Sequence, residues 1–116
     1  MADEAQAMDP AEARERIARD DAVVLDVQDE AGWGRAHLVN ANHTSNEELE
    51  DALDEVPDDQ FIILVCRDGE RSRELAQKLT EDGREAASIS GGMDAWLGAG
   101  FQVQPSPDPD LPRGGQ

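Results

Sequence analysis

The feature that most constrains the fold is an apolar run, Phe61–Val65, that ends at the only cysteine of the chain, Cys66. An uninterrupted apolar run of this length is typical of a strand covered on both faces, as in a parallel sheet. A polar loop with a glycine follows, and apolar residues at helical spacing begin directly after it. This order predicts an α/β unit with Cys66 at the carboxyl end of a central strand.

The remaining segments alternate in the same way. Asp9 and Pro10 predict the N-cap and first residue of a helix, and Glu12 has the spacing of a capping box. We expect this helix to continue over 11–19. Residues 29–46 carry turn residues without a period and predict mostly loop with one helical turn. Other helices are expected at 46–56, 72–83 and 93–99, and strands at 22–27 and 86–90. The alternation predicts an α/β domain with a mostly parallel sheet.

A chain of 116 residues predicts a single domain. Residues 1–8 have no apolar period and are expected to be a flexible N-terminus, followed by a folded domain over 9–103. Residues 104–116, rich in proline and aspartate, are expected to be a disordered tail. No secretory leader is readable, which predicts a cytoplasmic protein. The sequence leaves the oligomeric state open.

The net charge of −17, from 10 basic and 27 acidic residues, argues against nucleic-acid partners. No apolar run is long enough to span a membrane. A single cysteine excludes a disulfide framework and a cysteine-rich zinc site. The acidic excess with one lysine resembles proteins from organisms that live in high salt, where counterions screen self-repulsion.

The segment Cys66–Ser72 carries the chemistry. A loop leading into a helix start directs backbone N–H groups and the positive end of the helix dipole at an anion, here the thiolate of Cys66. Arg67 and Arg71 add positive charge, Gly69 allows a tight turn, and Ser72 is expected to be the helix N-cap. The alternative is a cysteine that is only a small buried apolar residue, which would gain nothing from a cationic loop.

Three motifs resemble the rhodanese (sulfurtransferase) family, and together they span nearly the whole predicted domain. Cys66–Ser72 is similar to the family's active-site loop, Cys-Arg-x-Gly-x-Arg-Ser. Val24–Gln28 resembles the first motif, Leu-Asp-Val-Arg. Ser90–Trp96, followed by Gly100 and Phe101, resembles the closing Gly-Gly-x-x-Ala-Trp and its later glycine.

The resemblance implies a three-layer domain with helices flanking the sheet, and sulfur transfer through a persulfide on Cys66. It implies a small sulfur donor such as thiosulfate, a thiol or protein-cysteine acceptor, and no metal or cofactor. The loop residues that would bind the substrate are Arg67, Asp68, Gly69, Glu70, Arg71 and Ser72. The carboxylates of Asp68 and Glu70 would oppose an anionic donor unless they point to solvent.

Two other functions use similar features. Cysteine phosphatases and arsenate reductases have Cys-x5-Arg, whereas this loop is Cys-x4-Arg, a smaller cradle that favours a single sulfur atom over phosphate. Rhodanese-like domains also serve as non-enzymatic sulfur carriers or regulatory binding modules, often without the cysteine.

Departures from the family pattern lie in the first motif and after it. Gln28 stands where relatives carry arginine, and residues 36–41 lack both glycines and the proline of the usual Gly-His-Ile-Pro-Gly-Ala. Asp26 lies in an apolar run and needs a partner, either a backbone N–H or an arginine near the loop, so it is expected to support the site. His37 is expected to support the structure rather than to react.

Overall fold

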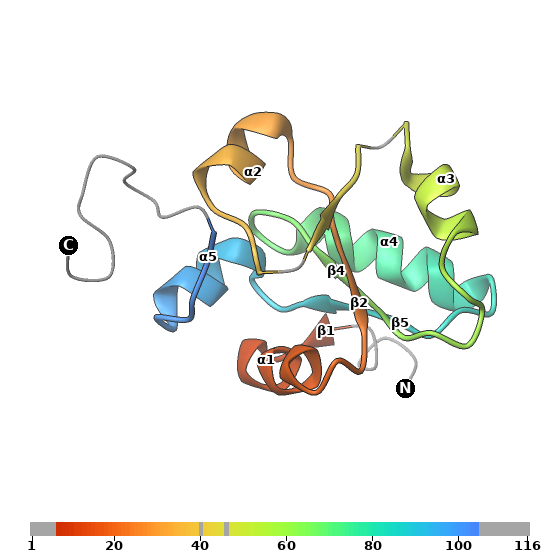
Figure 1. The fold of residues 1–116 in the computed structure, drawn as a ribbon, viewed down its shortest axis with the longest axis horizontal. Coiled ribbons are helices and arrows are strands. Elements are labelled where there is room, and N and C mark those ends of the chain that lie inside the picture. Colours follow the sequence, from red (N-terminus) through yellow and green to blue (C-terminus); the bar gives the residue numbers. More distant parts are fainter. Residues whose placement is uncertain (1–6, 40, 46, 105–116) are drawn as a thin grey trace.

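The structure is a computed structural model that describes residues 7–39, 41–45 and 47–104 (Figure 1). Its centre is a five-stranded sheet in the order β1-β5-β4-β2-β3, and every pairing is parallel. The strands are β1 (Ala7–Met8), β2 (Val23–Asp26), β3 (Asn42–His43), β4 (Ile62–Val65) and β5 (Ala86–Ile89). The helices are α1 (Pro10–Ala18), α2 (Glu30–Arg35), α3 (Leu49–Asp54), α4 (Glu70–Glu81) and α5 (Gly92–Gly98). The predicted mostly parallel α/β architecture is confirmed.

The strand β4 lies in the middle of the sheet, and all four of its residues are buried. Its side chains alternate between two apolar clusters, because successive residues of a strand point to opposite faces. Ile63 and Val65 pack with residues of α1 and α5 on one face. Ile62 and Leu64 pack with residues of α3 and α4 on the other. The sheet is therefore covered on both faces, as the uninterrupted apolar run predicts.

The parallel register brings the carboxyl ends of three strands together. Asp26 at the end of β2 lies beside Val65 at the end of β4, and Val27 N–H donates to Val65 O at 2.9 Å. The segment after β5 turns at Gly91 and Gly92, which both have positive φ. The three segments that follow these strands therefore meet at one edge of the sheet.

The structure corrects three details of the predicted elements. Ala7 and Met8, expected to belong to the flexible N-terminus, form β1 and pair with β5, since Met8 has an apolar cluster to pack into. Residues 29–46 contain a two-turn helix and β3 as well as loop. Asp9 is the N-cap of α1, but its side chain makes no capping hydrogen bond, so the expected capping box is not formed.

The predictions for residues 1–6 and 105–116 lie outside the described residues. Gln104, placed in the tail by the sequence, forms an isolated antiparallel bridge with His37. Within the part of the chain that the structure describes, no helix has the length and apolar character needed to cross a membrane.

Candidate active site

Cys66 directly follows the central strand, and the loop after it bends its backbone around the sulfur. Gly69 N–H donates to Cys66 Sγ at 3.2 Å, and Ser72 N–H donates to the same atom at 3.3 Å. Both groups belong to the N-terminal end of α4, which begins at Glu70 and runs for 12 residues. Two backbone donors and the positive end of a helix thus converge on one sulfur atom, an arrangement that stabilises negative charge there.

Ser72 is not the helix N-cap that the sequence suggests. The N-cap is Gly69, whose φ of 90° few other residues adopt, and Ser72 lies inside the first turn of α4. The Ser72 hydroxyl is fully buried, donates to Gly69 O at 3.3 Å and lies 3.3 Å from Cys66 Sγ. The prediction is wrong because the loop turns into a helix three residues earlier, which moves this side chain from capping the helix to contacting the sulfur.

The loop after Cys66 is held from behind by the start of α5. Met93 N–H donates to Cys66 O at 2.8 Å, and Asp94 N–H donates to Arg67 O at 2.9 Å. The backbones approach so closely that a Cβ atom on Gly69 would lie 2.8 Å from Gly91 N, and one on Gly92 would collide with Cys66 O. The paired glycines after β5 are therefore required by the close approach of this loop.

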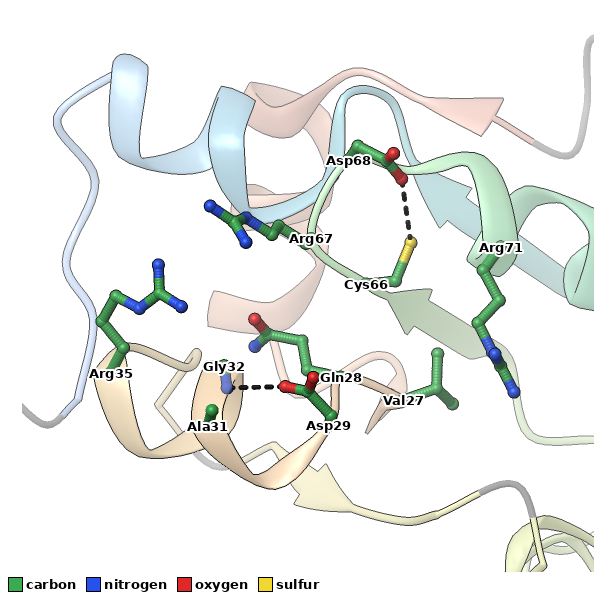
Figure 2. A pocket seen from close by; sticks show the side chains of 10 residues that line it. All are labelled: Val27, Gln28, Asp29, Ala31, Gly32, Arg35, Cys66, Arg67, Asp68 and Arg71. Carbon is green, nitrogen blue, oxygen red and sulfur yellow. Dashed lines mark hydrogen bonds between the residues drawn. The ribbon is translucent and has the colours of Figure 1, made fainter.

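The two carboxylates of the loop are placed differently. Glu70 is exposed to solvent, as its compatibility with an anion requires. Asp68 is also exposed, but it turns back over the loop, with Oδ1 3.8 Å from Cys66 Sγ and accepting the Glu70 N–H at 3.0 Å (Figure 2). Among the described residues, Asp68 Oδ1 and Ser72 Oγ are the two oxygens near enough to accept the thiol proton of Cys66.

Cys66 opens into a cavity of about 310 Å³ with two distinct walls (Figure 2). The loop wall consists of Cys66, Arg67, Asp68 and Arg71. The helix wall comes from the end of β2 and from α2, and consists of Val27, Gln28, Asp29, Ala31, Gly32 and Arg35. The sequence predicts the loop wall. It misses Arg35 and Asp29, since nothing in a loop-like segment without a period indicates that its residues face the cysteine.

Asp26 forms a buried pair with Gln28, a residue of the helix wall. Asp26 is fully buried, its Oδ1 accepts Gln28 N–H at 2.8 Å, and its Oδ2 accepts Gln28 Nε2–H at 3.0 Å. Burial raises the pKa of Asp26, and this outweighs the lowering by the two bonds from Gln28 and by the nearby His43 and His37. Of the two partners that the sequence suggests for Asp26, the structure has the backbone N–H and not an arginine.

His37 is half-buried, does not line the cavity around Cys66, and stacks on Trp33 with ring centroids 3.5 Å apart. Its Nδ1 lies 2.7 Å from Trp33 O. His43, to which the sequence assigned no role, also stacks on Trp33, with ring centroids 4.7 Å apart, and its Nε2 lies 2.8 Å from Gln28 O. The two histidines therefore hold α2 and Gln28 in position beside the cavity.

Comparison with known proteins agrees with this geometry. The chain matches the family described as the Rhodanese-like domain over residues 9–99. It is 33% identical over 96 residues to a protein named thiosulfate sulfurtransferase GlpE from Actinobacillus pleuropneumoniae, covering 82% of this chain and 89% of that one. A protein of the same name from Coxiella burnetii is 31% identical over 86 residues, or 73% of this chain and 80% of that one.

Solved structures show the same fold. A rhodanese-related protein from Thermoplasma volcanium superposes with a TM-score of 0.75 at 22% identity, covering 84% of this chain and 96% of the other. The thiosulfate sulfurtransferase of Pseudomonas aeruginosa superposes with a TM-score of 0.76 at 22% identity, covering 90% of this chain but 20% of the larger protein. The chain belongs to the family of rhodanese-like domains.

Proposed function

We propose that this protein is a sulfurtransferase that carries sulfane sulfur on Cys66. The observation that carries the proposal is the convergence of Gly69 N–H and Ser72 N–H on Cys66 Sγ at 3.2 and 3.3 Å. These donors favour the thiolate as the attacking species. Relatives at 31–33% identity bear the name thiosulfate sulfurtransferase, which supports the same reaction class.

In the first half-reaction the Cys66 thiolate attacks the outer sulfur of a donor such as thiosulfate. A bond forms between Cys66 Sγ and that sulfur, and the sulfur–sulfur bond of thiosulfate breaks with its electron pair leaving on sulfite. Arg67 and Arg71, both exposed at the cavity, attract the anionic donor. The charge is conserved, since a thiolate and a dianion become a persulfide anion and a dianion.

In the second half-reaction a thiophilic acceptor, such as cyanide or a thiolate, attacks the outer sulfur of the persulfide. The sulfur–sulfur bond breaks, and Cys66 leaves as the thiolate that starts the next cycle. Two half-reactions that share a covalent intermediate predict ping-pong kinetics. The N–H groups of Gly69 and Ser72, together with the Ser72 hydroxyl, would hold the sulfur through both steps.

The reaction with thiosulfate, followed by the intact mass of the protein, tests this function. We expect a gain of one sulfur atom, reversed by cyanide with release of thiocyanate. Cys66→Ser should gain none, whereas Arg73→Gln, an exposed α4 variant that does not line the cavity, should behave as the wild type. The proposal fails if neither thiosulfate nor another sulfane donor yields a persulfide, or if an artificial phosphate ester is hydrolysed in a Cys66-dependent reaction.

Transfer of sulfur from the loaded protein to different acceptors separates an enzyme from a sulfur carrier. Sulfur transfer from the loaded protein to several small thiols would indicate an enzyme. A persulfide that is delivered only to a protein cysteine would indicate a carrier. This alternative stays open because Gln28 departs from the Leu-Asp-Val-Arg motif that the segment resembles. Both outcomes require the persulfide on Cys66, so the mass measurement comes first.

A further inference from the structure

The helix wall contains an arginine, Arg35, that no family motif accounts for. It lies in the last turn of α2 and lines the cavity that contains Cys66. It also lines a small adjoining hollow of about 30 Å³ together with Arg67, Gln28 and residues of α5. Figure 2 shows the Arg35 and Arg67 side chains on the same side of the cavity, and Arg71 on the opposite side.

Gln28, another polar residue of the helix wall near Arg35, supplies no positive charge and has no hydrogen left to donate into the cavity. Its Nε2 has two hydrogens, and both are used, one by Asp26 Oδ2 at 3.0 Å and the other by Ala36 O at 3.1 Å. Its Oε1 lies so close to Gly32 that a Cβ atom on that residue would be 2.6 Å away from it. The role of this side chain is therefore to hold Asp26 and the end of α2.

Arg35 is the residue that brings positive charge to the helix wall. Among the residues that the structure describes, its guanidinium has no ion-pair or hydrogen-bond partner, whereas that of Arg67 has an exposed ion pair with Asp94 at 4.0 Å. Two guanidinium groups on one side of a cavity repel each other unless an anion lies between them. In a chain with net charge −17, such a local excess of positive charge favours anions at this cavity.

We propose that Arg35 is a substrate-binding residue that, with Arg67, holds the anionic end of the sulfur donor while its sulfur end faces Cys66. This deepens the proposed function and rests on it for the identity of the substrate as a sulfur donor. The substrate class is an anionic donor, whose sulfonate or carboxylate oxygens accept hydrogen bonds from the planar guanidinium of Arg35.

Alkylation of Cys66 tests the charge role of Arg35 without requiring sulfur transfer. Because Cys66 is the only cysteine, the rate of its modification can be measured with anionic iodoacetate and with neutral iodoacetamide. In Arg35→Gln we expect the iodoacetate rate to fall about three- to tenfold, with the iodoacetamide rate unchanged. Arg35→Lys should retain most of the iodoacetate rate. Arg19→Gln removes the same charge from an exposed position at the end of α1 and should change neither rate.

Steady-state kinetics with thiosulfate give the second measurement. We expect Arg35→Gln to raise KM about three- to tenfold and to leave kcat within twofold, as removal of ground-state binding does. The proposal is overturned if the iodoacetate to iodoacetamide ratio of Arg35→Gln equals that of Arg19→Gln, or if both alkylation rates change equally. If the ratio falls but no persulfide forms from any sulfane donor, an anion site at Arg35 is supported and the proposed sulfurtransferase function fails.

Discussion

The two walls of the cavity are built by different means. The loop wall, residues 66–71, is fixed by backbone contacts: N–H groups on Sγ, N–H groups of α5 on its carbonyls, and glycines at the points of closest approach. The helix wall, residues 27–35, is fixed by side chains, chiefly the bonds of Gln28 to Asp26 and Ala36. Backbone contacts tolerate many sequences but few glycine replacements, whereas side-chain contacts change when the residues change. The two walls should therefore respond differently to substitution, the loop wall at its glycines and the helix wall at Gln28.

The largest effect is expected from Gly92→Ala, which breaks the loop wall. Its Cβ would collide with Cys66 O and lie 2.6 Å from Gly69 N, and its φ of 59° is strained for alanine. We expect the free energy of unfolding to fall by about 3 kcal/mol or more, with loss of persulfide formation. Chemical denaturation and the mass assay measure these two effects.

Gly83→Ala is the matched control, because Gly83 also has positive φ but has open space around its Cβ position. It should cost about 1 kcal/mol from backbone strain alone and leave the active site intact. Equal effects of the two substitutions would show that the contact between Gly92 and the loop does not position Cys66.

The second effect, on the helix wall, is expected from Gln28→Ala. This variant removes both Nε2 bonds and leaves Asp26 Oδ2 and Ala36 O without those donors. We expect the free energy of unfolding to fall by about 2 kcal/mol. Gln77→Ala, at an exposed position on α4, should stay within about 0.5 kcal/mol of the wild type.

The Gln28→Ala variant also tests whether a change in the helix wall alters the reactivity of Cys66 in the loop wall. The rate of Cys66 alkylation by iodoacetamide in Gln28→Ala should remain within about twofold of the wild type, because Gly69 N–H and Ser72 N–H still reach Sγ. A large loss of that rate would mean that the two walls are not independent.

The third prediction concerns pH and the buried carboxyl group beneath the helix wall. Since burial raises the pKa of Asp26 in the folded protein, the folded state binds this proton more tightly than the unfolded state does. The contribution of Asp26 to stability is therefore largest at low pH and is lost as the pH rises from about 3.8 through the raised pKa.

Asp26→Asn cannot ionise and isolates this contribution from the other acidic groups. We expect the stability of the wild type relative to Asp26→Asn to decrease with pH between 4 and 7, measured by chemical denaturation at each pH. An increase over that interval would mean that the bonds from Gln28 and the charges of the histidines, rather than burial, dominate the pKa of Asp26.

Local patterns in the sequence were sufficient to predict the loop wall. An apolar run that ends at Cys66, followed by Gly69 and a helical period, predicts a strand, a tight turn and a following helix, although not the residue at which that helix begins. The contact of Gly91 and Gly92 with this loop, by contrast, is visible only in the structure.

The helix wall and the edge strand could not be predicted in this way, because they depend on contacts between distant segments. Arg35 reaches the cavity because α2 packs against the end of β2, and β1 exists because Ala7 and Met8 find β5. Ser72 contacts the sulfur instead of capping the helix because the turn closes at Gly69, against the start of α5. Single-residue preferences contain none of this information.

The smallest effect expected is that of salt, which should act on the two walls differently. Backbone donors contact Sγ directly and are little screened, whereas the exposed guanidinium of Arg35 acts through a field that 1 M salt limits to about 3 Å. Raising KCl from 0.1 to 2 M should therefore lower the iodoacetate to iodoacetamide ratio at Cys66 two- to threefold, on the order of 0.5 kcal/mol. The iodoacetamide rate should be nearly constant.

Over the same range of KCl concentration the free energy of unfolding should rise, because salt screens the repulsion among the acidic residues of a chain with net charge −17. A protein equally stable at both salt concentrations would contradict the high-salt interpretation of its composition. A ratio that does not respond to salt would mean that anion preference at this site comes from the backbone N–H groups on Cys66 Sγ and not from the arginines.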